Sequence, residues 1–310
     1  MNNLKPVNQT YLFGLHHYLQ ELIELDKKKC LPNKILLSGQ KGLGKSTLAY
    51  HFINYILSKD EEYKYDISNF VINKENHSFK TTLNKSNPNL IIIDVDHEKK
   101  MIDISQIREL LSNLQKSSFN NKPKFILIDN IEFLNINSIN ALLKVIEEPS
   151  INTHFILINN NKKILSTLIS RCINFKIFLS HKKNSEIAEK LIQNKLNEVI
   201  NDQLINYYST PGNIFNLFNF AKDNEYDLKN TNLKEFLKMV IKNNDYKKDE
   251  KIRFIIFDFI QLYFNKLNLT LSTKLNKKYH YFLRRISNTK KFNLDYETLF
   301  MEFEEQILNG

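Results

Sequence analysis

The segment GQKGLGKS, residues 39–46, carries the strongest chemical signal in the chain. It fits the pattern G-x-x-x-x-G-K-[ST] at every required position and follows an apolar run, as a phosphate-binding loop does. Glycines let such a loop curl until its backbone N–H groups face a phosphate chain. Lys45 supplies a positive charge for the β- and γ-phosphates, and Ser46 a hydroxyl for Mg²⁺. The pattern predicts a nucleoside triphosphate site, although an unused loop of this kind can also persist as scaffold.

A second candidate ligand stands at residue 129. Four apolar residues, 125–128, run into Asp129, as in a buried strand that carries a carboxylate to its exposed end. Beside a phosphate loop, this is the position of a second contact to Mg²⁺. A nucleotide hydrolase of this pattern normally has a glutamate next, whereas this chain has Asn130, which cannot accept a proton from water. The sequence therefore predicts nucleotide binding with impaired hydrolysis.

Buried strands must position these residues. Apolar runs predict four strands, at residues 34–39, 89–96, 124–129 and 154–159. Helical patterns separate them, and this alternation predicts a parallel sheet covered by helices.

The helices of this part have recognisable ends. They are predicted at residues 46–57, 103–114 and 137–148. Asp103 and Gln106 have capping-box spacing, Asn137 is predicted to cap the last of the three helices, and Pro149 to end it. The polar, irregular residues 59–88 are assigned no chemistry.

The strand pattern ends near Phe178, and helical patterns continue from there. The predicted fold class is α/β followed by all-α. We expect a nucleotide-binding domain at residues 1–178, a small helical lid at 179–225 and a helical C-terminal domain at 226–310.

Composition narrows the function classes. The 310 residues have ordinary hydrophobic (42%) and charged (25%) contents, as in a globular protein. Two cysteines rule out a disulfide framework, and the eight histidines form no cluster with ligand spacing, so we expect no zinc. We expect a cytoplasmic protein without membrane contact, because no signal peptide is visible and the apolar run 254–264 is too short to span a bilayer. The net charge of +10 favours phosphate-rich partners, but AT-rich coding bias explains it equally well.

Several ordered blocks resemble the clamp-loader family of AAA+ proteins. LFGLHHYLQELI near the N-terminus is similar to the family's opening, and NKILLSGQKGLGKSTLAYHFINYIL to its phosphate-loop block. NALLKVIEEP (residues 140–149) resembles a highly specific helix of the family. HFILINNNKKILSTLISRC (154–172) resembles its sensor 1 strand and Ser-Arg-Cys motif, and FNLDYETLF a typical ending. The resemblance covers nearly the whole chain and implies an AAA+ module, a lid and an oligomerisation domain, the collar.

The resemblance also implies roles for individual residues. Asp129 matches the Walker B aspartate, and Asn159 or Asn160 falls at sensor 1, which orients the attacking water. Arg171 matches the arginine finger, which in this family reaches the ATP bound by the neighbouring subunit. The residues that match the Walker A loop are Gly39, Gly42, Gly44, Lys45, Ser46 and Thr47.

Departures from the family pattern are equally informative. Asn130 replaces the Walker B glutamate, and Asn213 stands near the usual sensor 2 arginine. The family's four-cysteine zinc module is missing, and residues 59–88 occupy its place. These changes favour a non-motor subunit that binds ATP and Mg²⁺ without efficient hydrolysis. The implied partners are motor and delta subunits in a hetero-oligomeric ring, the sliding clamp and, through the complex, primed DNA.

Two alternatives remain open from the sequence. The intact phosphate loop also suits an active, gamma/tau-like motor ATPase of the clamp loader. A P-loop nucleotide kinase would need an acceptor-binding region and lid arginines, neither of which is evident. The run KLNKKYHYFLRR, residues 274–285, suits either contact with DNA phosphates or a solvated helix face, with Tyr279, Tyr281 and Phe282 expected in collar packing.

Overall fold

The chain divides into two compact units, Met1–Leu179 and Ser180–Gly310, in a computed structural model. The structure describes residues 5–95, 101–114, 120–147, 152–248, 250–267, 273–292 and 294–309. Asp96, Glu148 and Pro149, which the sequence assigns to a strand end and a helix end, lie outside these ranges. Each unit is described separately.

The first unit is built on a parallel sheet of five strands in the order β2-β3-β4-β1-β5. The strands are β1 (Lys34–Ser38), β2 (Leu90–Ile93), β3 (Lys124–Ile128), β4 (Thr153–Asn159) and β5 (Ile173–Lys176). Residues of β3 and β4 are buried on both faces, which explains their continuous apolar runs. The predicted parallel sheet is confirmed, but β5 was missed because this edge strand buries only Phe175.

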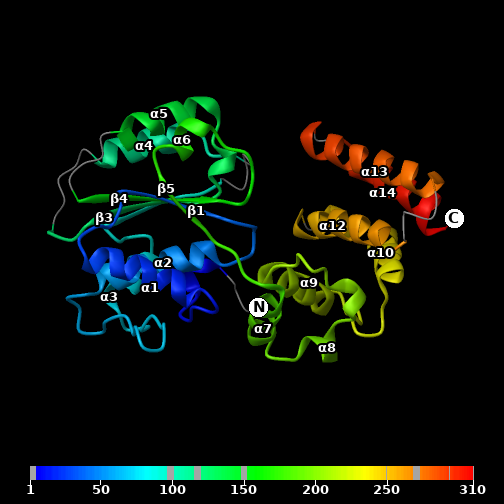
Figure 1. Cartoon of the computed structure of the whole chain (residues 1–310), viewed down its shortest axis with the longest axis horizontal. Helices are drawn as coiled ribbons and strands as arrows, with labels where there is room; N and C mark the ends of the chain where they lie inside the picture. The colour runs from blue at the N-terminus through cyan, green and yellow to red at the C-terminus, as the bar shows by residue number, and fades with distance from the viewer. Residues whose placement is uncertain are drawn as a thin grey trace. The chain divides into compact units, whose positions relative to one another are not determined.

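Helices cover both faces of this sheet. Figure 1 places α1, α2 and α3 on one face and α4, α5 and α6 on the other. Their bounds are η1 (Pro6–Asn8), α1 (His16–Lys27), α2 (Lys45–Leu57), α3 (His77–Leu83), α4 (Ile104–Leu114), η2 (Ile131–Phe133), α5 (Ile136–Glu147) and α6 (Ser166–Ile169).

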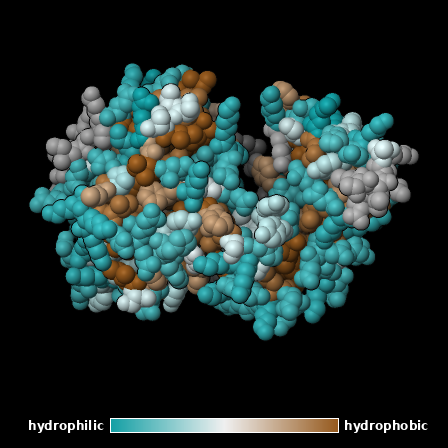
Figure 2. All heavy atoms as spheres, viewed as in Figure 1, coloured by the Kyte–Doolittle hydropathy of each residue, from teal (hydrophilic) through white to brown (hydrophobic). Residues whose placement is uncertain are grey.

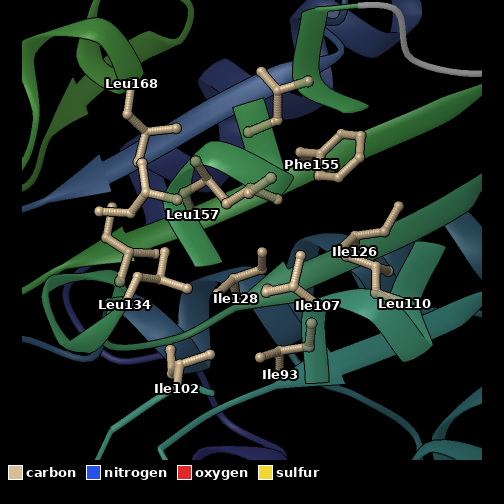
Figure 3. Packing of buried hydrophobic residues seen from close by; sticks show 14 of the residues in the cluster. Ile93, Ile102, Ile107, Leu110, Ile126, Ile128, Leu134, Phe155, Leu157 and Leu168 are labelled. Carbon is tan, nitrogen blue, oxygen red and sulfur yellow. The ribbon is translucent and has the colours of Figure 1, made fainter. Parts of the chain in front are cut away.

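A single apolar cluster joins α4, α5 and α6 to the sheet (Figure 3). Alternate residues of β3 and β4 point into it, because successive side chains of a strand face opposite ways. Its buried members include Ile126, Ile128, Phe155, Leu157, Ile107, Leu110, Leu142, Ile146 and Leu168.

Two local predictions need correction. Helix α5 begins at Ile136, and its cap is Asn135, whose Oδ1 accepts the Ser138 N–H at 2.8 Å. Asn137 therefore lies inside the helix. Residues 59–88 are not wholly irregular, since they contain α3, which Asn76 caps by accepting the Phe79 N–H at 2.7 Å. The capping-box glutamine is in place: Gln106 Oε1 accepts the Asp103 N–H at 2.9 Å.

The second unit is helical, as predicted. Its elements are α7 (His181–Ile192), α8 (Leu196–Val199), η3 (Asp202–Leu204), α9 (Pro211–Asp223), α10 (Leu233–Lys242), α11 (Asp245–Lys248), α12 (Glu250–Lys266), α13 (Thr273–Phe292), α14 (Tyr296–Phe303) and η5 (Glu304–Leu308). Helix α9 contacts α12, so the separation of a lid from a collar near residue 225 stays a prediction. Among the described helices, none is long and apolar enough to cross a membrane.

Aromatic rings form the core around α12 and α13. The Phe264 ring centroid lies 5.4 Å from that of Tyr279 and 6.0 Å from that of Phe282, which is buried. Tyr281 is exposed, and its hydroxyl donates to Glu302 Oε1 at 2.6 Å. Its ring centroid also lies 5.3 Å from that of Phe282, so all three residues named from the sequence make aromatic contacts, although only Phe282 is buried.

Gly39 lies where the backbone after β5 approaches the end of β1. The Ile177 N–H donates to Ser38 O at 2.7 Å, which extends the pairing of β1 with β5 past Lys176. A Cβ on residue 39 would lie 2.4 Å from Ile177 O, and its φ is +158°. No residue with a side chain fits there without moving one of the two strands.

We expect Gly39→Ala to lower the free energy of unfolding by roughly 3 kcal/mol, because a backbone atom must move. Gly44→Ala is the matched control: its φ of +86° is strained too, but a Cβ there meets only Leu15 Cδ1 at 3.5 Å. The control should cost about 1–2 kcal/mol. Urea unfolding of both variants measures the difference, and equal losses would contradict the steric explanation.

Candidate nucleotide-binding site

The phosphate-loop candidate, residues 39–46, joins β1 to the N-terminus of α2. Gly42 and Gly44 have φ values of +88° and +86°, in the left-handed region that favours glycine. Gly44 precedes the first residue of α2, Lys45. The loop thus delivers a lysine to a helix N-terminus, where free backbone N–H groups favour an anion.

Lys45 is buried and fully hydrogen-bonded, with 3% of its surface exposed. Its ammonium donates to the carbonyl oxygens of Gly39 at 2.9 Å and Gln40 at 2.6 Å. It also donates to Asn160 Oδ1 at 2.9 Å. These three bonds use all the donors of an ammonium group.

Burial lowers the pKa of Lys45 to about 8. The negative charges of Asp129 and Glu132 oppose this shift but do not cancel it. The nearby carboxylates therefore do not fully compensate the positive charge of Lys45, and the negative charges of a phosphate chain would do so.

Ser46 and Asp129 are in contact across the end of the sheet. The Ser46 hydroxyl donates to Asp129 Oδ2, and the Asn130 N–H donates to Asp129 Oδ1 at 2.8 Å. Burial raises the pKa of Asp129 to about 6, and the nearby Asp94 charge adds to the shift. Hydroxyl and carboxylate oxygens are the ligands that Mg²⁺ prefers, and Mg²⁺ takes few of them from protein when phosphates and water supply the rest. This pair therefore fits a nucleotide-bound magnesium ion.

A three-residue amide bridge, made of Asp94, Asn130 and Asn160, joins the ends of β2, β3 and β4. Asn130, in the left-handed conformation, donates from Nδ2 to Asp94 Oδ1 at 2.7 Å. Its Oδ1 accepts from Asn160 Nδ2 at 2.8 Å. The Asn160 amide and side chain also donate to the Glu132 carboxylate, at 3.3 and 3.1 Å. Both polar atoms of the Asn130 side chain are thus engaged within the protein.

The structure distinguishes the two sensor 1 candidates. Asn160 contacts Lys45, whereas Asn159 closes a turn: its side chain donates to Lys162 O at 2.9 Å and accepts the Lys162 N–H at 3.1 Å. Thr47 follows Ser46 on α2 and is partly buried. In the second unit, the Asn213 N–H is capped by Thr210 Oγ1 at 3.3 Å, at the start of α9.

Sequence reasoning missed Asp94 and Glu132. Asp94 ends its apolar strand as Asp129 ends the next one, so the same signal was available for it. Glu132 follows Asn130 by two residues, and only the turn into η2 brings it back to Asn160. In the part of the chain that the structure describes, no three His, Cys, Asp or Glu side chains group as a metal site.

Arg171 lies apart from this cluster, between α6 and β5. Its guanidinium is paired with Glu147, the last residue of α5, at 2.6 Å. The structure thus brings together the loop, Asp129 and Asn160, and it leaves Arg171 on a separate surface of the same unit.

A family model described as "DNA polymerase III, delta subunit" matches residues 14–180. This range includes the phosphate loop and the site residues Asp94, Asp129, Asn130, Glu132 and Asn160. The chain belongs to this family. The residues that the DNA polymerase III delta subunit model matches form more than half of the chain.

Individual relatives agree with this assignment. The DNA polymerase III subunit delta' of Buchnera aphidicola subsp. Schizaphis graminum is 26% identical over 280 residues, 87% of this chain and 83% of the relative. A DNA polymerase III subunit gamma of Buchnera aphidicola subsp. Acyrthosiphon pisum is 30% identical over 143 residues, but these are only 46% of this chain and 37% of the relative. The resemblance to the clamp-loader family is confirmed, and these relatives support its delta-prime subunit as the type.

A solved structure shares the fold. The chain aligns with a DNA polymerase III gamma subunit-related protein from Thermotoga maritima with a TM-score of 0.53 and 18% identity, over 92% of this chain and 96% of the other. The predicted α/β module followed by helices is confirmed.

We expect Asp129→Asn to stabilise the chain at neutral pH but not in acid. The folded-state pKa is raised, so the folded chain binds more protons than the unfolded chain between about pH 4 and 6, and ionisation above that window costs stability. The amide keeps an acceptor for Ser46 and carries no charge. The variant should gain about 1–2 kcal/mol at pH 7.5 and nothing at pH 4.

Urea unfolding at several pH values measures this, with the exposed Asp60→Asn as the control for a lost surface charge. A gain of the same size at pH 4 and pH 7.5 would show that ionisation of Asp129 is not its cause.

Proposed function

We propose that the chain is a non-motor, delta-prime-type subunit of the bacterial DNA polymerase III clamp loader. The observation that carries this proposal is the amide bridge at residue 130. Where a hydrolase needs a free carboxylate, Asn130 offers a carboxamide that is bonded to Asp94 and Asn160 on both sides. Such a group neither accepts a proton nor turns freely toward a water, so efficient hydrolysis is not expected.

The proposal includes binding of ATP with Mg²⁺ in the phosphate loop. Lys45 would exchange its carbonyl partners for phosphate oxygens, because a charged acceptor binds an ammonium more strongly. Ser46 and Asp129 would hold the metal ion, which neutralises phosphate charge when bound. In a non-motor subunit, such a nucleotide stabilises the fold without being turned over.

Arg171 would serve as an arginine finger for the neighbouring subunit's ATP. Three apolar residues near it in sequence, Leu165, Ile169 and Ile173, are 43%, 40% and 56% exposed. Figure 2 shows hydrophobic surface over the region of α5 and α6. A guanidinium among exposed apolar residues suits a surface that another protein chain covers, because large exposed apolar areas mark interaction sites.

The remaining parts of the proposal follow the resemblance. The partners are motor and delta subunits in a hetero-oligomeric ring, which loads the sliding clamp onto primed DNA in the cytoplasm. The lid, residues 179–225, and the collar, residues 226–310, would supply the contacts that hold the ring together.

A catalytically active, gamma/tau-like motor subunit is the second candidate. The observation that favours it is Glu132, a carboxylate that already accepts two hydrogen bonds from Asn160. If Glu132 activated water in place of the missing Walker B glutamate, the chain alone would hydrolyse ATP.

We expect Lys45→Met to weaken Mg²⁺–ATP binding to the purified chain at least tenfold, because the buried cation for the phosphates is lost. Lys41→Met, in the same loop but exposed, is the matched control for net charge. Since the pKa of Lys45 is about 8, the affinity of the unaltered chain should fall as the pH rises above 8, with proton uptake on binding. Titration calorimetry in two buffers measures both effects; affinity equal in Lys45→Met and the unaltered chain would refute nucleotide binding at this loop.

The decisive experiment is ATP turnover by the chain alone and by the reconstituted ring on primed DNA. We expect no turnover alone and a severalfold loss in rings that carry Arg171→Ala, because one interface loses its finger. Arg108→Ala, an exposed arginine on α4, should leave ring turnover unchanged. Robust turnover by the chain alone would instead make it a motor.

A further inference from the structure

Three hydrogen bonds orient the Arg171 guanidinium. Nε and Nη2 donate to one oxygen of Glu147, Oε1, at 3.0 and 2.6 Å. Nη1 donates to the carbonyl oxygen of Thr167 at 2.9 Å. The plane of the guanidinium is therefore fixed by a carboxylate on one side and by a backbone carbonyl on the other.

This arrangement leaves part of the guanidinium available. Arginine has five N–H donors, and its bonds to the described residues use three of them. Nη1 and Nη2 each keep one N–H, and neither belongs to the Nε–Nη2 edge that Glu147 occupies. Two such N–H groups are the fork that binds a phosphate through two oxygens.

The two residues that hold Arg171 are exposed, but each lies beside a residue of the packed core. Glu147 ends α5, whose Ile146 is fully buried, and Thr167 precedes Leu168 of α6 in the same apolar cluster. Figure 3 shows Leu168 pointing into that cluster. The backbone of both residues is thus held by packed helices, and the three hydrogen bonds restrict an Arg171 side chain that would otherwise sample many rotamers.

We propose that Glu147 is a positioning residue for Arg171: it holds the guanidinium by one edge so that the outer N–H pair is presented to a phosphate of a neighbouring subunit. This inference rests on the proposed role of Arg171 as a finger. Stability is not the reason for the pair, since the side chains are 35% and 50% exposed and such surface pairs contribute little. If the Arg171 side chain is ordered before assembly, the loss of its rotamer entropy no longer adds to the barrier of the catalytic step.

If Glu147 instead sequestered Arg171, its removal would raise ATP turnover. A carboxylate that merely sequestered Arg171 would compete with phosphate, so its removal would release the finger and raise turnover. A surface pair without function would leave turnover unchanged.

The test measures kcat and KM for ATP of the complete ring on primed DNA. We expect Glu147→Ala to lower kcat about three- to tenfold with KM unchanged, since the finger acts on the developing transition-state charge. Glu147→Gln keeps an acceptor oxygen for Nε and Nη2 and should restore at least half of the loss. Glu75→Ala, which removes the exposed partner of Lys80, is the matched control and should change neither constant.

A double variant that combines Glu147→Ala with Arg171→Ala separates the positioning role of Glu147 from the finger role of Arg171. If Glu147 acts through Arg171, the double variant should equal Arg171→Ala alone. A normal kcat in Glu147→Ala, or an increased one, would overturn the positioning role while Arg171→Ala still lowers kcat. If Arg171→Ala itself has no effect, the finger assignment fails, and the role of Glu147 fails with it.

Discussion

The parallel register of β3, β4 and β1 is the constraint on which the site depends. Ser38 pairs with Asn159, so β1 and β4 end level with each other, and Ile128 pairs with Leu157, so β3 ends two residues earlier at the same edge of the sheet. The residues that follow each strand therefore lie at that edge: the phosphate loop follows β1, Asp129 follows β3 and Asn160 follows β4. Parallel strands can end this way only because helices return the chain across the faces of the sheet, which also buries those faces. The core that stabilises the unit therefore also fixes the distances within the site.

The same edge concentrates charge that the fold stabilises only in part. Lys45 and Asp129 are largely buried. Burial lowers the pKa of Lys45 to about 8 and raises the pKa of Asp129 to about 6, so both shifts favour the neutral form of the side chain. Amide groups mediate between them, with Asn160 bonded to Lys45 on one side and to Asn130 on the other. An arrangement of buried ions and amides contributes specificity of geometry more than stability, because desolvation offsets most of the attraction. The site accordingly suits a polyanion and a divalent cation together.

The sequence predicted the features that depend on short-range pattern. A phosphate loop is specified by glycines and a lysine at fixed spacing, and central strands are specified by continuous apolar runs. The sequence therefore predicted the loop, the central strands and the site residues Lys45, Ser46 and Asp129 that they position. The edge strand β5 was missed because burial on one side leaves a weak pattern, and α3 was hidden in a polar segment. Asn135 takes the capping role expected of Asn137, a choice that depends on which backbone turn the preceding residues adopt. Glu132 and Glu147 reach their partners only through tertiary packing, which no spacing rule reveals.

The amide bridge restricts which side chains residue 130 can carry. A glutamate at this position would take away the amide donor of Asp94 and set a further carboxylate close to that aspartate and to Glu132. Like charges at such short range repel, so a glutamate at residue 130 would be unfavourable unless its neighbours also changed. Substitutions at Asp94, Asn130 and Glu132 should therefore be strongly non-additive. We therefore expect these positions to change together in evolution rather than singly.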